Sequence, residues 1–222
     1  MLKTVFAFLA LIAAPAAADE TARPLPAPML DATLASGASE TAVLAGGCFW
    51  GMQGVFQHVK GVKQVLSGYS GGAAASARYP AVGTGTTGHA ESVQIVFDPH
   101  VVSYGQILQV FFSVMDPTTL GYQGPDYGPQ YRSEVFAADA AQRRTAEAYI
   151  AQLTKAHAFS DAIVTRVSTV RGFYPAEAYH QDYLVRHPDQ PYIAVNDLPK
   201  IDKLHRFYSQ LYREHPVTVA QR

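Results

Sequence analysis

The sequence predicts an α+β protein with a ferredoxin-like, split β-α-β core to which a helix, a strand and long loops are added. Three observations lead to this fold class. Apolar residues recur in turn with the two-residue period of strands and with the longer period of helices. The elements between residues 41 and 137 follow the order β-α-β-β-α-β. The 222 residues show no internal repeat and suit one domain.

The first 18 residues have the features of a secretory signal peptide. Lys3 provides a positive charge, residues 5–14 form a short apolar run, and three alanines ending at Ala18 fit a small-residue cleavage site. We therefore expect the protein to be periplasmic or secreted after cleavage near Ala18.

The rest of the chain divides into an arm and one domain. Residues 19–40 carry prolines among alanine, serine and threonine, which predicts a flexible linker or arm, and residues 41–222 are expected to form a single domain. Removing the first 18 of 222 residues leaves 204, and the loss of Lys3 changes the net charge from −1 to −2. This balance does not indicate binding to nucleic acid or to an anionic membrane surface.

The domain begins with a strand, a helix and a second strand. Residues 41–45 form a short apolar strand that ends at two glycines. Residues 48–59 carry apolar side chains at helical spacing, and residues 62–69 return to a strand pattern. A loop rich in glycine, alanine and serine follows over 70–89.

The next strand shows the clearest alternation in the sequence. Over residues 91–97, Val93, Ile95 and Phe97 are expected to face inward, and an Asp-Pro pair ends the strand. Ser103 is a good N-cap for the helix that follows, and a second Asp-Pro pair closes that helix.

The remaining elements complete the sheet and its cover. A loop rich in glycine, proline and tyrosine runs over 118–130, followed by a strand at 132–137, a helix at 139–156 and a strand at 162–170. Residues 200–214 place apolar side chains on one face of a helix. This pattern fits a partner-binding helix or, more commonly, a terminal helix docked on its own core.

Cys48, the only cysteine, lies beside Trp50, the only tryptophan, in the segment GGCFWG at 46–51. At the start of a helix the dipole favours a thiolate, so the position predicts a depressed pKa for a reactive thiol. Phe49 and Trp50 are placed to wall an apolar pocket. Residue types alone fit equally well a cysteine that is a small core residue. With one cysteine, no internal disulfide can form.

Four further residues are candidates for chemistry. Glu91 opens a strand after a glycine loop, where an adjacent apolar sheet would raise the pKa of its carboxyl and make it an acid. Asp126 and Tyr131 lie in the loop that leads into the next strand, and Tyr79 lies in the other long loop. A solvated strand-end glutamate, and turn chemistry or packing for the others, are the alternatives.

The eight histidines raise the question of a metal site. His180 and His187 are seven residues apart and share one helix face if that segment is helical. No thiol, HExxH motif or paired carboxylate joins them, so we expect no metal.

Five short motifs resemble, in identity and order, those of the type A peptide methionine sulfoxide reductases. They are GGCFWG at 46–51, GYSGG at 68–72, GHAE at 88–91, QYRS at 130–133, and FYPAE at 173–177 with YHQ at 179–181. The resemblance covers roughly residues 41–200, and five collinear motifs make it specific.

The resemblance implies a role for each matching residue. Cys48 would be the nucleophile that attacks the sulfoxide sulfur, and Glu91 the acid that protonates the sulfoxide oxygen. The phenols of Tyr79 and Tyr131 would hydrogen-bond that oxygen, and Asp126 would help to organise the site. Phe49 and Trp50 would receive the methyl group of the substrate.

The implied activity is reduction of the S epimer of methionine sulfoxide in oxidised proteins or peptides, through a sulfenic acid on Cys48, with the free amino acid as a second candidate substrate. Many family members carry one or two resolving cysteines in a glycine-rich tail after the position of Tyr192, whereas the tail of this chain has none. An external thiol, from a thioredoxin-like protein or a small molecule, would then be the reductant. No bound cofactor is expected, and the expected oligomeric state is a monomer.

Two alternative functions remain compatible with the residues. One is a secreted module that binds methionine sulfoxide without turnover, which the presence of both Cys48 and Glu91 disfavours. The other is an acyl transferase with a cysteine nucleophile, which needs a histidine base that the sequence does not single out.

Overall fold

The computed structural model describes residues 24–31, 37 and 39–219. The predicted signal peptide, residues 1–18, and half of the predicted arm, residues 19–23, 32–36 and 38, therefore lie outside the described residues. No helix within the described ranges is long and apolar enough to cross a membrane.

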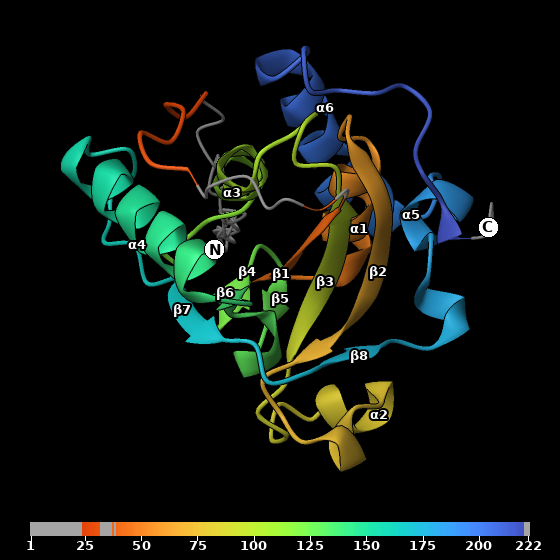
Figure 1. Cartoon of the computed structure of the whole chain (residues 1–222). Helices are drawn as coiled ribbons and strands as arrows, with labels where there is room; N and C mark the ends of the chain where they lie inside the picture. The colour runs from red at the N-terminus through yellow and green to blue at the C-terminus, as the bar shows by residue number, and fades with distance from the viewer. Residues whose placement is uncertain (1–23, 32–36, 38, 220–222) are drawn as a thin grey trace, which may run out of the picture.

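A six-stranded sheet with the order β7-β6-β1-β3-β2-β8 forms the centre of the molecule (Figure 1). Its strands are β1 (Glu40–Gly46), β2 (Val62–Ser70), β3 (Ala90–Phe97), β6 (Ser133–Ala137), β7 (Arg166–Thr169) and β8 (Phe173–Pro175). β6 and β7 pair parallel, and all other neighbours pair antiparallel. The inner order β6-β1-β3-β2 arises from the predicted β-α-β-β-α-β unit, so the predicted fold class is confirmed.

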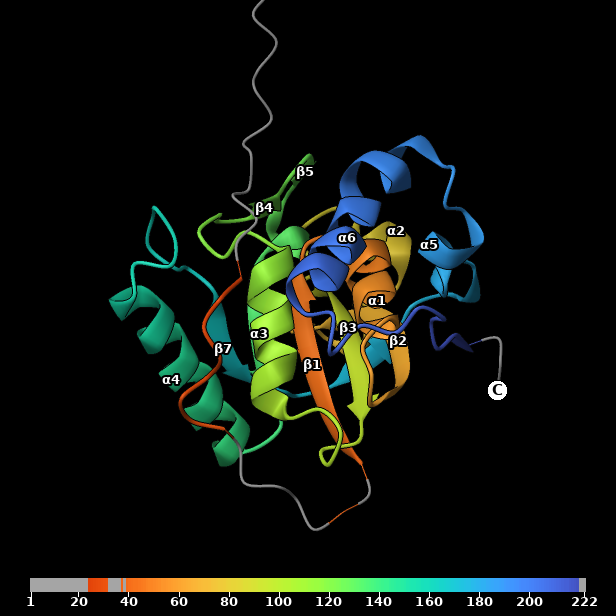
Figure 2. The ribbon, with the colours of Figure 1, turned by 90° about the horizontal axis from the view of Figure 1, so that it is seen from above.

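Helices cover one face of this sheet. In Figure 2, α1 and α3 lie over the central strands, with α4 on the β6–β7 side and α6 beside α1. The helices are α1 (Phe49–Gln57), α2 (Tyr79–Val82), α3 (Tyr104–Val114), α4 (Ala140–Lys155), α5 (Tyr183–Arg186) and α6 (Leu198–Phe207). The small hairpin of β4 (Tyr122–Gln123) and β5 (Asp126–Tyr127) stands apart from the sheet.

The inward face of β3 follows the alternation of its sequence. Val93, Ile95 and Phe97 are fully buried in the main core between the sheet and the helices, as predicted. The predicted N-cap of α3 is also confirmed, because the Ser103 side chain accepts from the Gln106 N–H and the Gln106 side chain accepts from the Ser103 N–H.

The C-terminal third departs most from the sequence prediction. The strand predicted over 162–170 is reduced to β7, and β8 and α5 were not predicted. The helix predicted over 200–214 is α6, which begins at Leu198 and ends at Phe207, after a π-helical turn at Ile193–Asp197. Its apolar face is docked on the core of its own chain through residues such as Leu204, which favours the second of the two interpretations above.

Residues 24–31 correct part of the predicted flexible arm. Leu25 is 5% exposed, and its backbone exchanges hydrogen bonds with the Tyr208 hydroxyl and the Gln109 side chain. The Asp31 carboxylate accepts from the Gly105 N–H. Further hydrogen bonds to Tyr149 and Gln152 hold this segment against α4, and such tertiary contacts cannot be read from a compositional pattern.

Candidate functional site

Cys48 lies between β1 and α1, where it is the N-cap residue of α1. The turn requires glycine at Gly47, whose φ is +92° and where an added Cβ would lie 2.5 Å from Cγ of Gln123. The GGC segment therefore sets the position of the thiol: it follows the C-terminal end of β1, a central strand, and the tight turn places it at the first turn of α1.

The thiol of Cys48 is buried, with 8% of the residue exposed. Burial raises its pKa well above the usual range, and the nearby carboxyls of Glu91 and Asp197 raise it further. The backbone N–H of Trp50 and the Lys200 ammonium lower the pKa, but by less. The predicted depressed pKa is therefore wrong for the free protein, because desolvation and two carboxyls outweigh the helix terminus.

Glu91 lies on β3 directly beside the start of α1. The residue is 3% exposed, and its Oε2 accepts from the Phe49 N–H at 3.1 Å. Burial raises the pKa of its carboxyl to about 8, although the Phe49 N–H opposes this shift. The interpretation of Glu91 as a solvated strand-end residue is excluded, and the carboxyl keeps its proton at neutral pH.

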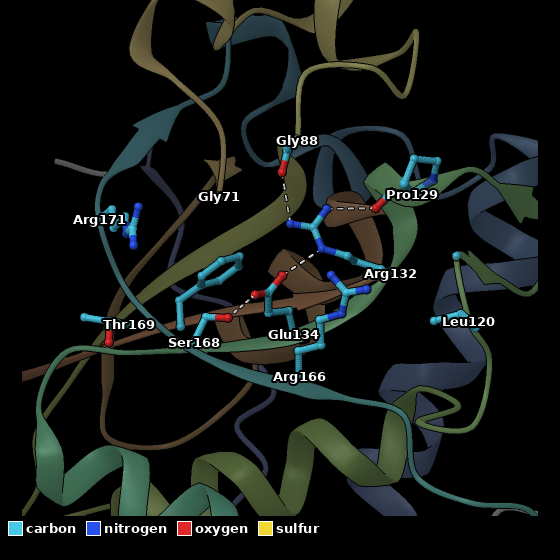
Figure 3. Close-up of a pocket in the computed structure, with 12 residues that line it drawn as sticks. Gly71, Gly88, Leu120, Pro129, Arg132, Glu134, Arg166, Ser168, Thr169 and Arg171 are labelled. Carbon is cyan, nitrogen blue, oxygen red and sulfur yellow. Dashed lines mark hydrogen bonds and ion pairs between the residues drawn. The ribbon is translucent and has the colours of Figure 1, made fainter.

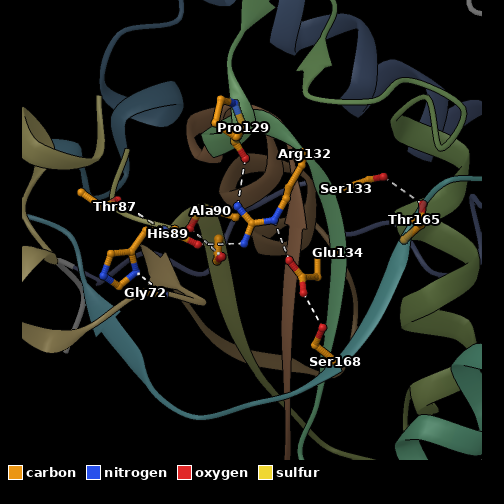
Figure 4. A network of polar contacts seen from close by, with 12 residues as sticks. Gly72, Thr87, His89, Ala90, Pro129, Arg132, Ser133, Glu134, Thr165 and Ser168 are labelled. Carbon is orange, nitrogen blue, oxygen red and sulfur yellow. Dashed lines mark hydrogen bonds and ion pairs between the residues drawn. The ribbon is translucent and has the colours of Figure 1, made fainter. Parts of the chain in front are cut away.

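The chain that leads into Glu91 is fixed by a polar network (Figure 4). The Nδ1 atom of His89 accepts from the Gly72 N–H at 3.2 Å, and its Nε2 lies 3.0 Å from the Ala73 carbonyl. Arg132 donates to the carbonyl of Gly88 at 3.0 Å. These contacts join the GYSGG, GHAE and QYRS segments, so three of the five motifs fix the backbone that leads into Glu91.

Aromatic side chains form one wall beside Cys48. The Trp50 indole stacks on Tyr183, with 3.9 Å between ring centroids, and donates from Nε1 to Nδ1 of His180 at 3.1 Å. Tyr79 and Phe49 pack against the same His180 ring, at centroid distances of 4.4 and 5.0 Å. The apolar wall predicted from Phe49 and Trp50 is therefore present, and His180 is its centre.

Three polar residues face the same site from other segments. Asp126 accepts a short hydrogen bond from the Tyr192 hydroxyl. The pKa of Tyr131 is raised by burial and then by the charges of Glu91 and Asp126, with a smaller effect of Cys48. Burial and the Glu91 charge likewise raise the pKa of Tyr79. The structure thus gathers the six other predicted residues around Cys48, and the role of each is a prediction.

Asp197 and Lys200 are site residues that the sequence analysis missed. Asp197 is completely buried, and its Oδ1 pairs with Lys200 Nζ at 3.1 Å. A Cβ at Gly51 would lie only 2.1 Å from that Oδ1, so the glycine in α1 allows the carboxyl to approach. Both residues lie in the tail, where the sequence offered no signal besides the absence of cysteine.

Glu177 and His180 were also missed as site residues, although both belong to motifs quoted above. Glu177 accepts from the Tyr69 hydroxyl at 2.8 Å and from the Tyr79 N–H at 2.9 Å. It therefore fixes Tyr79, while His180 fixes Trp50. Within the described ranges, no group of three histidine, cysteine, aspartate or glutamate residues is placed to hold a metal.

The geometry suits one kind of chemistry. A buried thiol lies next to a carboxyl that is protonated at neutral pH, with an aromatic wall beside it and phenols near the carboxyl. Such a site can attack an electrophilic centre with sulfur while an acid protonates a departing oxygen.

Comparisons with known proteins agree with this chemistry. The family model described as peptide methionine sulfoxide reductase matches residues 40–211. A peptide methionine sulfoxide reductase MsrA 2 of Mesorhizobium japonicum is 58% identical over 182 residues, which cover 82% of this chain and 93% of that protein. The MsrA 2 of Synechocystis is 51% identical over 190 residues, which cover 83% and 88%.

Solved structures show the same fold. The reduced form of Mxr1 from Saccharomyces cerevisiae superposes with a TM-score of 0.63 at 30% identity, over 72% of this chain and 91% of that chain. Methionine sulfoxide reductase A of Corynebacterium diphtheriae gives a TM-score of 0.60 at 31% identity, over 69% and 77%.

Proposed function

The chain belongs to the peptide methionine sulfoxide reductase family, and from this premise we propose that it reduces the S epimer of methionine sulfoxide with Cys48 as the nucleophile. It is an oxidoreductase that returns methionine sulfoxide to methionine. Its substrates are oxidised proteins and peptides, together with free methionine sulfoxide.

One observation carries the proposal: the carboxyl of Glu91 lies at the start of α1 beside Cys48 and holds its proton up to a pH of about 8. Sulfoxide oxygen is a poor leaving group, so thiol attack requires a proton on that oxygen. Among the described residues, two carboxyls raise the pKa of Cys48, those of Glu91 and Asp197. Of these two, only Glu91 accepts a hydrogen bond from the α1 backbone.

The first step balances without any other reactant. The Cys48 sulfur attacks the sulfoxide sulfur, Glu91 transfers its proton to the sulfoxide oxygen, and the thiol proton passes to Glu91. The attack forms a transient bond between the two sulfur atoms. That S–S bond and the substrate's S–O bond then break as the hydroxyl group moves to Cys48, where a new S–O bond forms. Cys48 is thereby oxidised to a sulfenic acid, the sulfoxide is reduced to methionine, and Glu91 ends protonated.

The surrounding side chains position the substrate in this step. The Trp50–Phe49 wall receives the methyl group, and its orientation is fixed by the hydrogen bond to His180. The phenols of Tyr79 and Tyr131, whose raised pKa values keep them protonated, donate hydrogen bonds to the sulfoxide oxygen.

The sulfenic acid is then reduced by an external thiol, because the chain has one cysteine. A first thiol attacks the Cys48 sulfur, water leaves with the sulfenic oxygen, and a mixed disulfide forms. A second thiol attacks that disulfide, which restores the Cys48 thiol and releases an oxidised thiol pair. A thioredoxin-like protein or a small thiol fits this role.

The alternative functions are not favoured. An acyl transferase needs a base on its cysteine, and within the described residues no histidine hydrogen-bonds Cys48, while Nδ1 of His180 accepts from Trp50. A binding module without turnover does not require a protonated carboxyl beside a thiol.

We also propose that the enzyme acts in the periplasm or outside the cell after cleavage near Ala18. Support comes from the Lys3 charge, the short apolar run and the alanines before the cleavage site. The intact mass of the exported protein tests this, because an unchanged N-terminus would contradict it.

The proposed activity predicts selectivity for one epimer. With a small dithiol as reductant, the purified enzyme should convert the S epimer of a methionine sulfoxide peptide and leave the R epimer, because one arrangement of methyl group and oxygen fits the Trp50 wall and Glu91 together. Chromatography of the two separated epimers measures this. Equal conversion of both, or conversion of neither, would contradict the proposal.

A further inference from the structure

We infer that a basic cleft on the opposite face of the sheet from Glu91 is a binding site for small oxyanions, the class of phosphate and carboxylates. The inference does not depend on the proposed function. Along β3, Glu91 lies on the face that packs against the main core, and Ala90 lies on the opposite face. Ala90 belongs to a smaller apolar cluster with Phe136, and Phe136 lines the cleft.

The cleft has a volume of about 740 Å³, within the range of small-molecule sites. Three arginines and one glutamate line it, together with glycines at the ends of β2 and β3: Arg132, Arg166, Arg171, Glu134, Gly71 and Gly88. Figure 3 shows the guanidinium groups of Arg132 and Arg166 directed toward the same hollow, with Arg171 on its far side.

Arg132 and Glu134 form an ion pair with each other, and both also hydrogen-bond to neighbouring residues. Arg132 Nε donates to Glu134 Oε2 at 2.7 Å, and its other nitrogens donate to the carbonyls of Pro129 and Gly88 at 2.9 and 3.0 Å. The second oxygen of Glu134 accepts from the Ser168 hydroxyl at 2.5 Å. The Glu134 side chain is buried, that of Arg132 is 14% exposed, and the pair adds no net charge to the cleft.

Arg166 is the cross-strand neighbour of Glu134 in the β6–β7 ladder. A glutamate opposite an arginine is the usual partner for an ion pair, but both oxygens of Glu134 already accept hydrogen bonds from other residues. Among the residues described, neither the Arg166 nor the Arg171 side chain has a hydrogen bond or an ion pair. Two unpaired guanidinium groups therefore line one cleft.

This charge balance defines the ligand class. The cleft carries three positive charges and one negative charge, which leaves a net charge of +2 on the side chains that line it. Guanidinium groups donate planar, paired hydrogen bonds that match phosphate and carboxylate oxygens. Arg143 donates to the hydroxyl of Thr169, which lines the cleft, but its charge is paired with Glu147 and is not counted in this balance. A cation is disfavoured at such a site.

The test is calorimetric titration of the exported, mature protein with inorganic phosphate and, separately, with succinate, at constant ionic strength with chloride as reference. We expect saturable binding of at least one of the two anions with one site per chain. R166Q should weaken this binding by about tenfold or more, as expected for the loss of hydrogen bonds to a charged group. R171Q should weaken it in the same direction.

R144Q is the matched control, since Arg144 is an exposed arginine on α4 that does not line the cleft. It should bind the anion as the parent protein does, and reduction of methionine sulfoxide should be unchanged in all three variants. Phosphate binding alone would assign the site to tetrahedral oxyanions, and succinate binding alone to carboxylates. No saturable binding of either anion, or equal loss in R144Q and R166Q, would overturn the inference.

Discussion

Replacing Cys48 by serine is expected to abolish the reduction of methionine sulfoxide while leaving the fold nearly intact. A hydroxyl is far less nucleophilic than a thiol near neutral pH, and no other residue of the chain carries a thiol. Because the buried position holds a side chain of almost equal size, we expect a thermal unfolding midpoint within a few degrees of the parent protein.

The experiment is a single-turnover assay of methionine release, with circular dichroism and thermal unfolding as the check on the fold. A binding module would keep its affinity for a methionine sulfoxide peptide in C48S, so affinity is measured alongside. Turnover near that of the parent protein would rule out Cys48 as the nucleophile.

Replacing Glu91 by glutamine should slow sulfenic acid formation by about 10²–10⁴-fold, the usual effect of losing a positioned general acid. The amide oxygen can still accept from the Phe49 N–H, which isolates the loss of the acidic proton. E147Q is the matched control, because Glu147 lies on the exposed face of α4. A rate for E91Q within a few fold of the parent would show that Tyr79, Tyr131 or water supplies the proton.

The parent enzyme and E91Q should also differ in how their single-turnover rates depend on pH. Glu91 loses its proton as the pH rises through about 8, and its negative charge then raises the pKa of Cys48 further. Proton donation and thiolate formation are both impaired, so the single-turnover rate of the parent enzyme should fall above that pH. In E91Q this decrease should be absent, because no carboxyl titrates there.

The sequence was sufficient to predict the core of this fold. The alternation of Val93, Ile95 and Phe97 marks the central strand unambiguously, and the Ser103 capping box fixes the start of α3. Both signals are local, so tertiary contacts did not override them. The sequence also allowed Cys48 and Glu91 to be predicted as site residues, because each lies where a loop leads into a helix or a strand.

The site residues of the C-terminal region could not be predicted from the sequence, because their positions depend on contacts between distant segments. Asp197 reads as a surface aspartate, but the missing side chain at Gly51 opens the space that buries it beside Cys48. The raised pKa of Cys48 has the same origin, because burial and the two carboxyls that set it come from residues distant in sequence. The docking of Leu25 likewise depends on residues distant in sequence, namely Gln109 in α3 and Tyr208.

The central claim is that one thiol, Cys48, carries the reaction and that an outside thiol completes it. The direct measurement is the number of methionines released per enzyme in the absence of reductant, together with the intact mass of the product. We predict a burst of one methionine and the gain of one oxygen on Cys48, after which turnover rises with the concentration of added thiol. A burst of two methionines per enzyme would require a second oxidisable group and would contradict the account.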